Sequence, residues 1–79
     1  MLNDFKEILK TNYDITDVKL TSNFKKDFYL TSFDFINLMC LIEEKYNVII
    51  EEEYYRTLNT VDDLIKYIKL EIENVNFRQ

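Results

Sequence analysis

Apolar residues recur with helical spacing in the middle of the chain. They fall on one face of a helix over residues 32–46, and this face consists of Phe35, Leu38, Met39, Ile42 and Tyr46. Thr31 precedes the run and Asp34 follows three residues later, which is a short-armed form of the capping box. The pattern therefore predicts a helix that begins with Ser32 at its first position and has Thr31 as its N-cap.

Three other stretches also carry helical signals. An apolar stripe predicts a first helix over residues 2–11, ended by Asn12 in the left-handed conformation. Acidic residues at 51–53 begin a short third helix over residues 52–57. Thr60 and Asp63 repeat the capping box and predict a last helix over residues 61–74. The stripes of the first and last helices are Leu2, Phe5, Ile8 and Leu9, and Val61, Leu64, Ile65, Ile68 and Ile72.

The segments between these helices must turn without glycine or proline, since the chain contains neither. Residues 13–30 are aperiodic and predict a long loop, which we expect Ile15, Val18, Leu20 and Phe24 to hold against the bundle. Asn47 ends the second helix. Residues 48–50 are β-branched, but no second strand is available to pair with them, so they predict an extended linker.

These elements together predict one all-α domain over residues 1–79. It is a small four-helix bundle with three longer helices, one short third helix and a long loop between the first two. The expected core is made of Phe5, Leu9, Phe35, Leu38, Met39, Ile42, Ile65 and Ile68.

Composition and net charge exclude several classes of function. The chain has 79 residues, of which 47% are hydrophobic, and this favours a compact domain over a disordered segment. A net charge of −5 argues against nucleic acid as a partner and favours basic protein surfaces. No apolar run predicts a membrane span, no leader peptide is recognisable, and one cysteine fits a reducing cytoplasm. The absence of histidine excludes Ser–His and Cys–His catalytic pairs, so we expect no catalytic residues and no enzyme.

The stretch around Ser32 resembles a known motif. Residues 27–34 read Asp-Phe-Tyr-Leu-Thr-Ser-Phe-Asp and are similar to the acyl carrier protein pattern Asp-Leu-Gly-x-Asp-Ser-Leu-Asp. The following helix ends in Glu-Glu-Lys-Tyr, where that family has Glu-Glu-x-Phe, and the likeness extends over residues 20–27 and 59–68. The chain has Thr-Ser-Phe in place of the pattern's Asp-Ser-Leu, so that Thr31 replaces Asp, and Tyr29 replaces Gly. A positive φ at Tyr29 would be strained, because only glycine adopts it cheaply.

The resemblance implies a carrier function. Ser32 would bear 4′-phosphopantetheine, transferred from coenzyme A by a phosphopantetheinyl transferase, and the thiol of that group would hold acyl groups as thioesters. The monomeric chain would present them to acyl-activating or acyl-transferring enzymes with basic docking patches, in fatty acid, polyketide or related biosynthesis. The bundle interior would shelter part of the acyl chain, with Phe28, Tyr55 and Leu58 near the entrance.

A second face of the helix over residues 32–46 carries Phe33, Ile36 and Cys40. It predicts either a wide buried face or an apolar patch for partners, flanked by Asp34, Asn37, Glu43 and Glu44. The alternative to the carrier is an unmodified interaction module that acts through this helix alone. Cys40 is interpreted as a small apolar residue. We expect no metal site, because the acidic residues at 51–53 and 62–63 match no EF-hand spacing.

Overall fold

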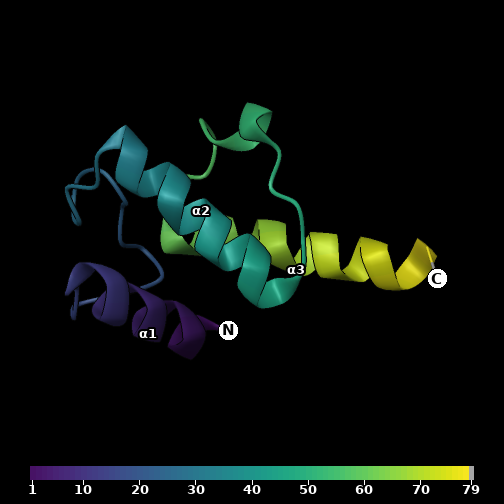
Figure 1. The fold of residues 1–79 in the computed structure, drawn as a ribbon, viewed down its shortest axis with the longest axis horizontal. Coiled ribbons are helices and arrows are strands. Elements are labelled where there is room, and N and C mark those ends of the chain that lie inside the picture. The colour runs from purple at the N-terminus through teal and green to yellow at the C-terminus, as the bar shows by residue number, and fades with distance from the viewer. Residues whose placement is uncertain (79) are drawn as a thin grey trace.

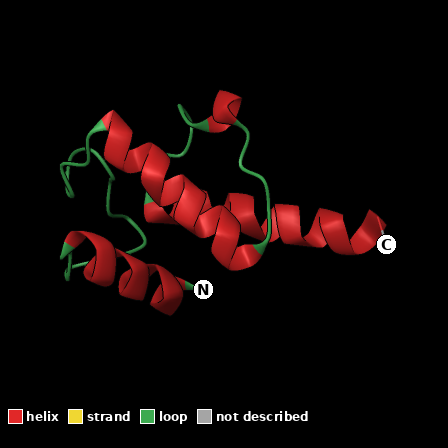
Figure 2. Ribbon diagram, viewed as in Figure 1, coloured by secondary structure: helices red, strands yellow, loops and turns green. Residues whose placement is uncertain are grey.

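The computed structural model describes residues 1–78. Its α-helices are α1 (Leu2–Tyr13), α2 (Ser32–Tyr46) and α3 (Val61–Arg78), and one 3₁₀ turn, η1 (Glu52–Tyr54), lies between α2 and α3. Figure 1 shows α1 and α2 alongside the first half of α3, whose last turns extend past both. Figure 2 shows no strand in this part of the chain. The small all-α bundle is confirmed, with three α-helices and a 3₁₀ turn in place of the expected third helix.

The core lies where the apolar stripes of the helices meet. All eight residues that the sequence predicts for the core are buried in one cluster. Phe5, Leu38 and Met39 are each exposed by 1% or less. Burial of such stripes supplies most of the stability of short helices, which are marginal in isolation. The Tyr46 hydroxyl also donates to Asp4 Oδ2 at 2.8 Å and ties α2 to α1. Burial and the Asp4 carboxylate raise the pKa of Tyr46 well above its usual range.

Two kinds of contact hold the long loop between α1 and α2 against the helices. Val18, Phe24 and Leu30 insert their side chains into the core. The loop backbone also pairs with the residues before α3, because the Phe24 N–H donates to Asn59 O at 3.0 Å. Leu20 does not anchor the loop as predicted: its side chain is 44% exposed, and its carbonyl oxygen accepts from the Asp62 N–H.

Helix ends differ from the prediction at two places. Residue Asp14, with φ 56°, takes the left-handed position after α1. Asn12 does not, since it lies inside the helix and its Nδ2 donates to Ile8 O at 2.9 Å. The Asn47 cap of α2 is confirmed, with φ 54°. The expected third helix over residues 52–57 is replaced by the 3₁₀ turn η1, in which the N–H of residue i+3 donates to the carbonyl of residue i, as from the Tyr55 N–H to Glu52 O at 3.1 Å.

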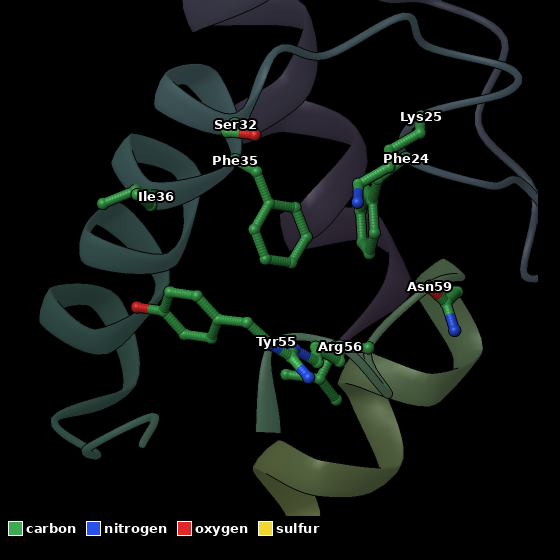
Figure 3. A pocket seen from close by; sticks show the side chains of 9 residues that line it. Phe24, Lys25, Ser32, Phe35, Ile36, Tyr55, Arg56 and Asn59 are labelled. Carbon is green, nitrogen blue, oxygen red and sulfur yellow. The ribbon is translucent and has the colours of Figure 1, made fainter. Parts of the chain in front are cut away.

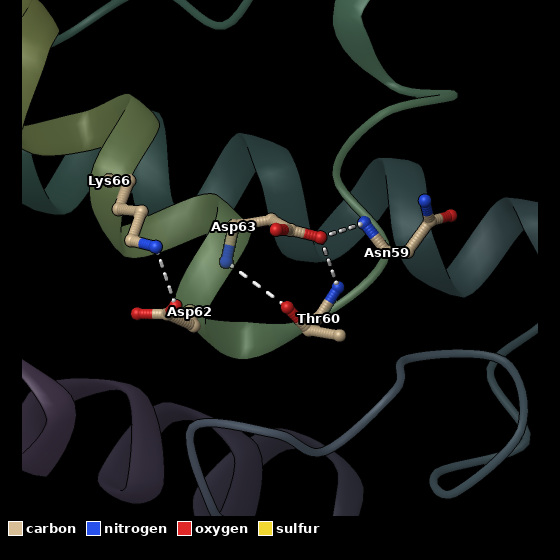
Figure 4. Close-up of polar contacts among 5 residues, drawn as sticks. All are labelled: Asn59, Thr60, Asp62, Asp63 and Lys66. Atoms are coloured by element: carbon tan, nitrogen blue, oxygen red, sulfur yellow. Dashed lines mark hydrogen bonds and ion pairs between the residues drawn. The ribbon is translucent and has the colours of Figure 1, made fainter.

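The start of α3 follows its predicted cap (Figure 4). Thr60 Oγ1 accepts from the Asp63 N–H at 3.2 Å, and Asp63 Oδ2 accepts from the Thr60 and Asn59 N–H groups at 3.1 and 3.2 Å. Lys66 Nζ forms an ion pair with Asp62 at 3.0 Å. Within residues 1–78 no group of three His, Cys, Asp or Glu side chains could hold a metal ion. None of the helices described is long and apolar enough to cross a membrane.

The linker between α2 and η1 is extended, as predicted. Val48 and Ile50 are buried, whereas Ile49 between them is 71% exposed, which is the alternation of an extended chain. The Ile50 N–H donates to Glu43 Oε2 at 2.8 Å. The Glu43 carboxylate therefore fixes the point at which the chain leaves α2.

Tyr29 occupies a strained conformation just before α2. Its φ is 57°, and its side chain is 82% exposed. Asp14 and Asn47 are also left-handed, but short polar side chains tolerate this region better than a bulky tyrosine. The ring thus offsets little of the backbone strain by burial.

Tyr29→Gly is expected to raise the free energy of unfolding by about 1 kcal/mol, because glycine removes the steric cost of the left-handed region. Urea unfolding measures this change. Asn47→Gly is the matched control and should give a smaller gain, since asparagine already tolerates this conformation. A loss of stability in Tyr29→Gly would mean that the exposed ring makes stabilising contacts.

Candidate functional site

Ser32 lies at the exposed mouth of α2, where the chain leaves the long loop. The predicted capping box is present: Thr31 Oγ1 accepts from the Asp34 N–H at 3.1 Å, and Asp34 Oδ2 accepts from the Thr31 N–H at 3.2 Å. Ser32 takes no part in this box. The chain has one other serine, Ser22, which is buried and whose Oγ accepts from the Lys19 N–H at 2.9 Å. Ser32 therefore presents the one exposed serine hydroxyl of the sequence.

The long loop fixes the position of the first residues of α2. Leu30 is buried, and its N–H donates to Phe24 O at 3.1 Å. The left-handed turn at Tyr29 comes directly before Leu30, and Thr31 then adopts an extended conformation with ψ 168°. The position of Ser32 is thus set by a buried anchor on one side and the helix cap on the other.

A hollow of about 150 Å³ lies beside Ser32 (Figure 3). Its walls come from three segments far apart in the sequence: the long loop, α2 and the residues after η1. The aromatic rings of Phe24, Phe35 and Tyr55 form its base, with successive ring centroids 5.5 Å apart at 69° and 78°. This edge-to-face geometry is the favoured arrangement of packed aromatic rings. The full lining is Phe24, Lys25, Ser32, Phe35, Ile36, Tyr55, Arg56, Leu58 and Asn59.

The residues around Ser32 fit an anionic ester. The first N–H groups of a helix have no acceptor within the helix, and the helix dipole is positive at this end. Lys25 and Arg56 line the same hollow as Ser32, which has no carboxylate in its lining. A phosphodiester on the Ser32 oxygen would thus meet favourable charge without burying it, because the Ser32 side chain is exposed.

The residues expected near the hollow divide into two groups. Tyr55 and Leu58 line it, as predicted. Phe28 does not: it packs edge-on against Phe24 at 6.2 Å and lines a separate polar hollow beside the loop. The sequence did not identify four other residues as part of this lining: Phe24, Lys25, Arg56 and Asn59. Burial and the nearby Glu43 carboxylate raise the pKa of Tyr55.

The second face of α2 is exposed. Phe33 is 80% exposed and Ile36 is 47% exposed, and Cys40 is also accessible. The wide buried face considered for these residues is therefore wrong. Asn37 and Glu44 are exposed on the same helix. The Asn37 Nδ2 donates to the Tyr13 hydroxyl at 2.9 Å, which in turn donates to Asp34 O at 3.1 Å.

Two acidic residues of this helix have structural partners that the sequence did not reveal. The Asp34 carboxylate accepts from the Thr31 N–H, and the Glu43 carboxylate accepts from the Ile50 N–H. The first contact follows from the local capping pattern. The second depends on the path of the linker seven residues later and has no local sequence signal. Glu44 remains an exposed acid of this helix.

Comparison with known proteins identifies the family of the chain. The family model described as the phosphopantetheine attachment site matches residues 2–68. The acyl carrier protein of Wolinella succinogenes is 32% identical over 71 residues, covering 87% of this chain and 93% of that protein. The acyl carrier protein of Chlamydia caviae is 37% identical over 68 residues, covering 84% of this chain and 88% of that protein. The chain therefore belongs to the acyl carrier protein family, whose members are carriers and not enzymes and whose cofactor is 4′-phosphopantetheine.

Proposed function

We propose that Ser32 is the attachment site of 4′-phosphopantetheine and that the chain carries acyl groups for fatty acid, polyketide or related biosynthesis. The observation that carries this proposal is the exposed Ser32 hydroxyl, at the first position of α2 and beside a hollow whose lining includes Lys25 and Arg56. The free, exposed Cys40 is compatible with a reducing compartment, and we place the protein as a monomer in the cytoplasm.

The attachment step needs a hydroxyl from this chain and a base from elsewhere. Ser32 Oγ attacks the pantetheine-linked phosphorus of coenzyme A, an Oγ–P bond forms, and the bond to the bridging oxygen breaks. 3′,5′-ADP leaves, and the hydroxyl proton passes to a base of the transferase. Mg²⁺ bound by the transferase neutralises the leaving pyrophosphate oxygen. When bound, the group supplies a thiol that holds acyl groups as thioesters.

The alternative is an unmodified module that binds partners through α2. Tyr29 and Thr31 favour it, because they depart from the family pattern next to Ser32. Intact mass after incubation with coenzyme A, Mg²⁺ and a phosphopantetheinyl transferase separates the two functions, and the carrier is expected to gain one phosphopantetheine. No gain with several transferases, also in a Tyr29→Gly/Thr31→Asp variant that restores the family pattern, would decide for the module.

We propose that partner enzymes dock on the exposed face of α2, which we call the docking face. It comprises Phe33, Asp34, Ile36, Asn37, Cys40, Glu43 and Glu44. An apolar centre with acidic neighbours suits a partner with an apolar pocket and a basic rim. Asp34 and Glu43 add charge while their carboxylates remain bound to backbone N–H groups. Glu44 is the acid best suited to steer partners, since it is exposed.

Glu44→Lys is expected to slow association with the transferase about two- to fivefold at low salt, because it reverses one steering charge. The effect should shrink at high salt, where exposed charges are screened. Glu53→Lys is the matched control, since Glu53 is an exposed acid in η1 and lies outside the docking face. Surface plasmon resonance measures both rates. Equal slowing by the two variants would mean that net charge, and not this face, governs the encounter.

A further inference from the structure

We propose that Lys25 and Arg56 form a cationic site beside Ser32 that selects partner enzymes with an acidic residue opposite them. The same site disfavours partners whose docking surface is basic throughout. Lys25, Arg56 and Ser32 line one hollow. The inference rests on the proposed attachment at Ser32 and on the proposed docking face, and it deepens both by naming the charge pattern of the partner.

Both cations are available to a partner. The side chains of Lys25 and Arg56 are exposed, and the hollow that they line has no carboxylate in its lining. Among the side chains that the structure describes, the one ion pair joins Lys66 and Asp62. No carboxylate of this part of the chain therefore neutralises Lys25 or Arg56 at short range, and their charge acts on the surface around Ser32.

The backbone that carries each cation is fixed. The Asn23 Oδ1 accepts from the Lys25 N–H at 2.9 Å. After η1, the Thr57 N–H donates to Tyr54 O at 2.9 Å and closes the turn that contains Arg56. Figure 3 shows the two cations reaching the hollow from these separate segments. A partner that covers the Ser32 end of α2 therefore meets both charges together.

The cationic site is separate from the acidic end of the docking face. Ser32 and Glu44 are twelve residues apart on α2, which is about 18 Å along the helix axis. The Debye length at physiological ionic strength is about 8 Å, so a partner senses the two ends separately. The surface is thus complementary to a partner with a basic group opposite Glu44 and an acidic group opposite Lys25 and Arg56. A basic group beside Ser32 would be repelled, which is selection against the wrong partner.

The test measures docking of a broad-specificity phosphopantetheinyl transferase whose docking surface is basic. Lys25→Glu/Arg56→Glu should raise its association rate about five- to twentyfold at low salt, because two repulsive charges become attractive. The gain should shrink as salt is added. Surface plasmon resonance gives the rate, also in a Ser32→Ala background, where docking is independent of attachment. Modification followed by intact mass should show a lower KM with an unchanged kcat.

Lys6→Glu/Lys69→Glu is the matched control. Lys6 on α1 and Lys69 on α3 are exposed, and neither lines the hollow, yet the change in net charge is the same. The control should raise the association rate by less than about twofold, because distant exposed charges are screened. Lys25→Gln/Arg56→Gln removes the two charges without reversing them and should give an intermediate gain.

A second measurement changes the partner. A transferase variant with glutamate in place of the basic residue nearest its active-site mouth should associate faster with the wild-type chain. The same variant should associate more slowly with Lys25→Glu/Arg56→Glu. This reversal measures the coupling between the two surfaces directly.

Three results would overturn the selection of acidic partners. Equal gains in the Lys25/Arg56 and Lys6/Lys69 variants would mean that net charge governs docking. No gain in Lys25→Glu/Arg56→Glu would mean that the partner does not meet these cations. Slower modification at an unchanged association rate would assign them to the phosphodiester on Ser32. Absence of modification with every transferase would instead overturn the attachment at Ser32, while the association rates still decide the charge pattern.

Discussion

Ser32→Ala is expected to abolish the gain of phosphopantetheine completely, because it removes the only exposed serine oxygen. The neighbouring Thr31 cannot replace it, since Thr31 Oγ1 is engaged by the Asp34 N–H at 3.1 Å. Ser22 is buried and cannot reach a transferase. Intact mass after incubation with coenzyme A, Mg²⁺ and the transferase gives the result. The circular dichroism spectrum should be nearly unchanged, because an exposed substitution outside the cap is mild.

Thr31→Ala provides the matched control for Ser32→Ala. It removes the N-cap side chain and should lower the free energy of unfolding by about 1 kcal/mol, yet it leaves the Ser32 hydroxyl in place. We therefore expect Thr31→Ala to be less stable but still modified, and Ser32→Ala to be stable but unmodified. A phosphopantetheine found on Ser32→Ala, at Ser22 or Thr31, would refute the assignment of Ser32.

Local signals explain why α2 was predictable. Its start was set by Thr31 and Asp34, whose reciprocal hydrogen bonds join residues three apart. Its buried face followed from helical periodicity, and its end from Asn47, which takes a left-handed conformation. The exposed face of α2 was harder, because periodicity placed Phe33 and Ile36 together without deciding whether another segment covers them. Their exposure depends on the paths of the loop and the linker.

The parts that escaped prediction depend on contacts distant in sequence. The hollow combines Phe24, Phe35 and Tyr55, which three separate segments bring together. The third helix was overestimated because acidic residues at 51–53 favour a helix start, whereas this stretch has few side chains to bury against the bundle. The conformation of Tyr29 was not predicted, because the cost of a positive φ at tyrosine favoured another path for the loop; its φ of 57° shows that the chain makes a left-handed turn there despite that cost.

The core face of α2 should dominate stability. Leu38 is 1% exposed and lies on the face of α2 that packs into the core. Leu38→Ala is expected to lower the free energy of unfolding by about 2–5 kcal/mol, through the lost burial and the cavity left behind. Small domains have a total stability of only about 5–15 kcal/mol, so this variant could lose a large fraction of it. Urea unfolding should show a lower midpoint with little change in slope.

Leu70→Ala is the matched control, because Leu70 is 60% exposed on α3 and its truncation should change the free energy by less than about 0.5 kcal/mol. A loss below about 1 kcal/mol in Leu38→Ala would contradict its place in the core, since even partial relaxation around a buried leucine costs more. The folded fraction of Leu38→Ala should still accept phosphopantetheine, because Leu38 neither lines the hollow nor lies on the docking face. Loss of stability with retained modification would separate the core face of α2 from the face that carries its function.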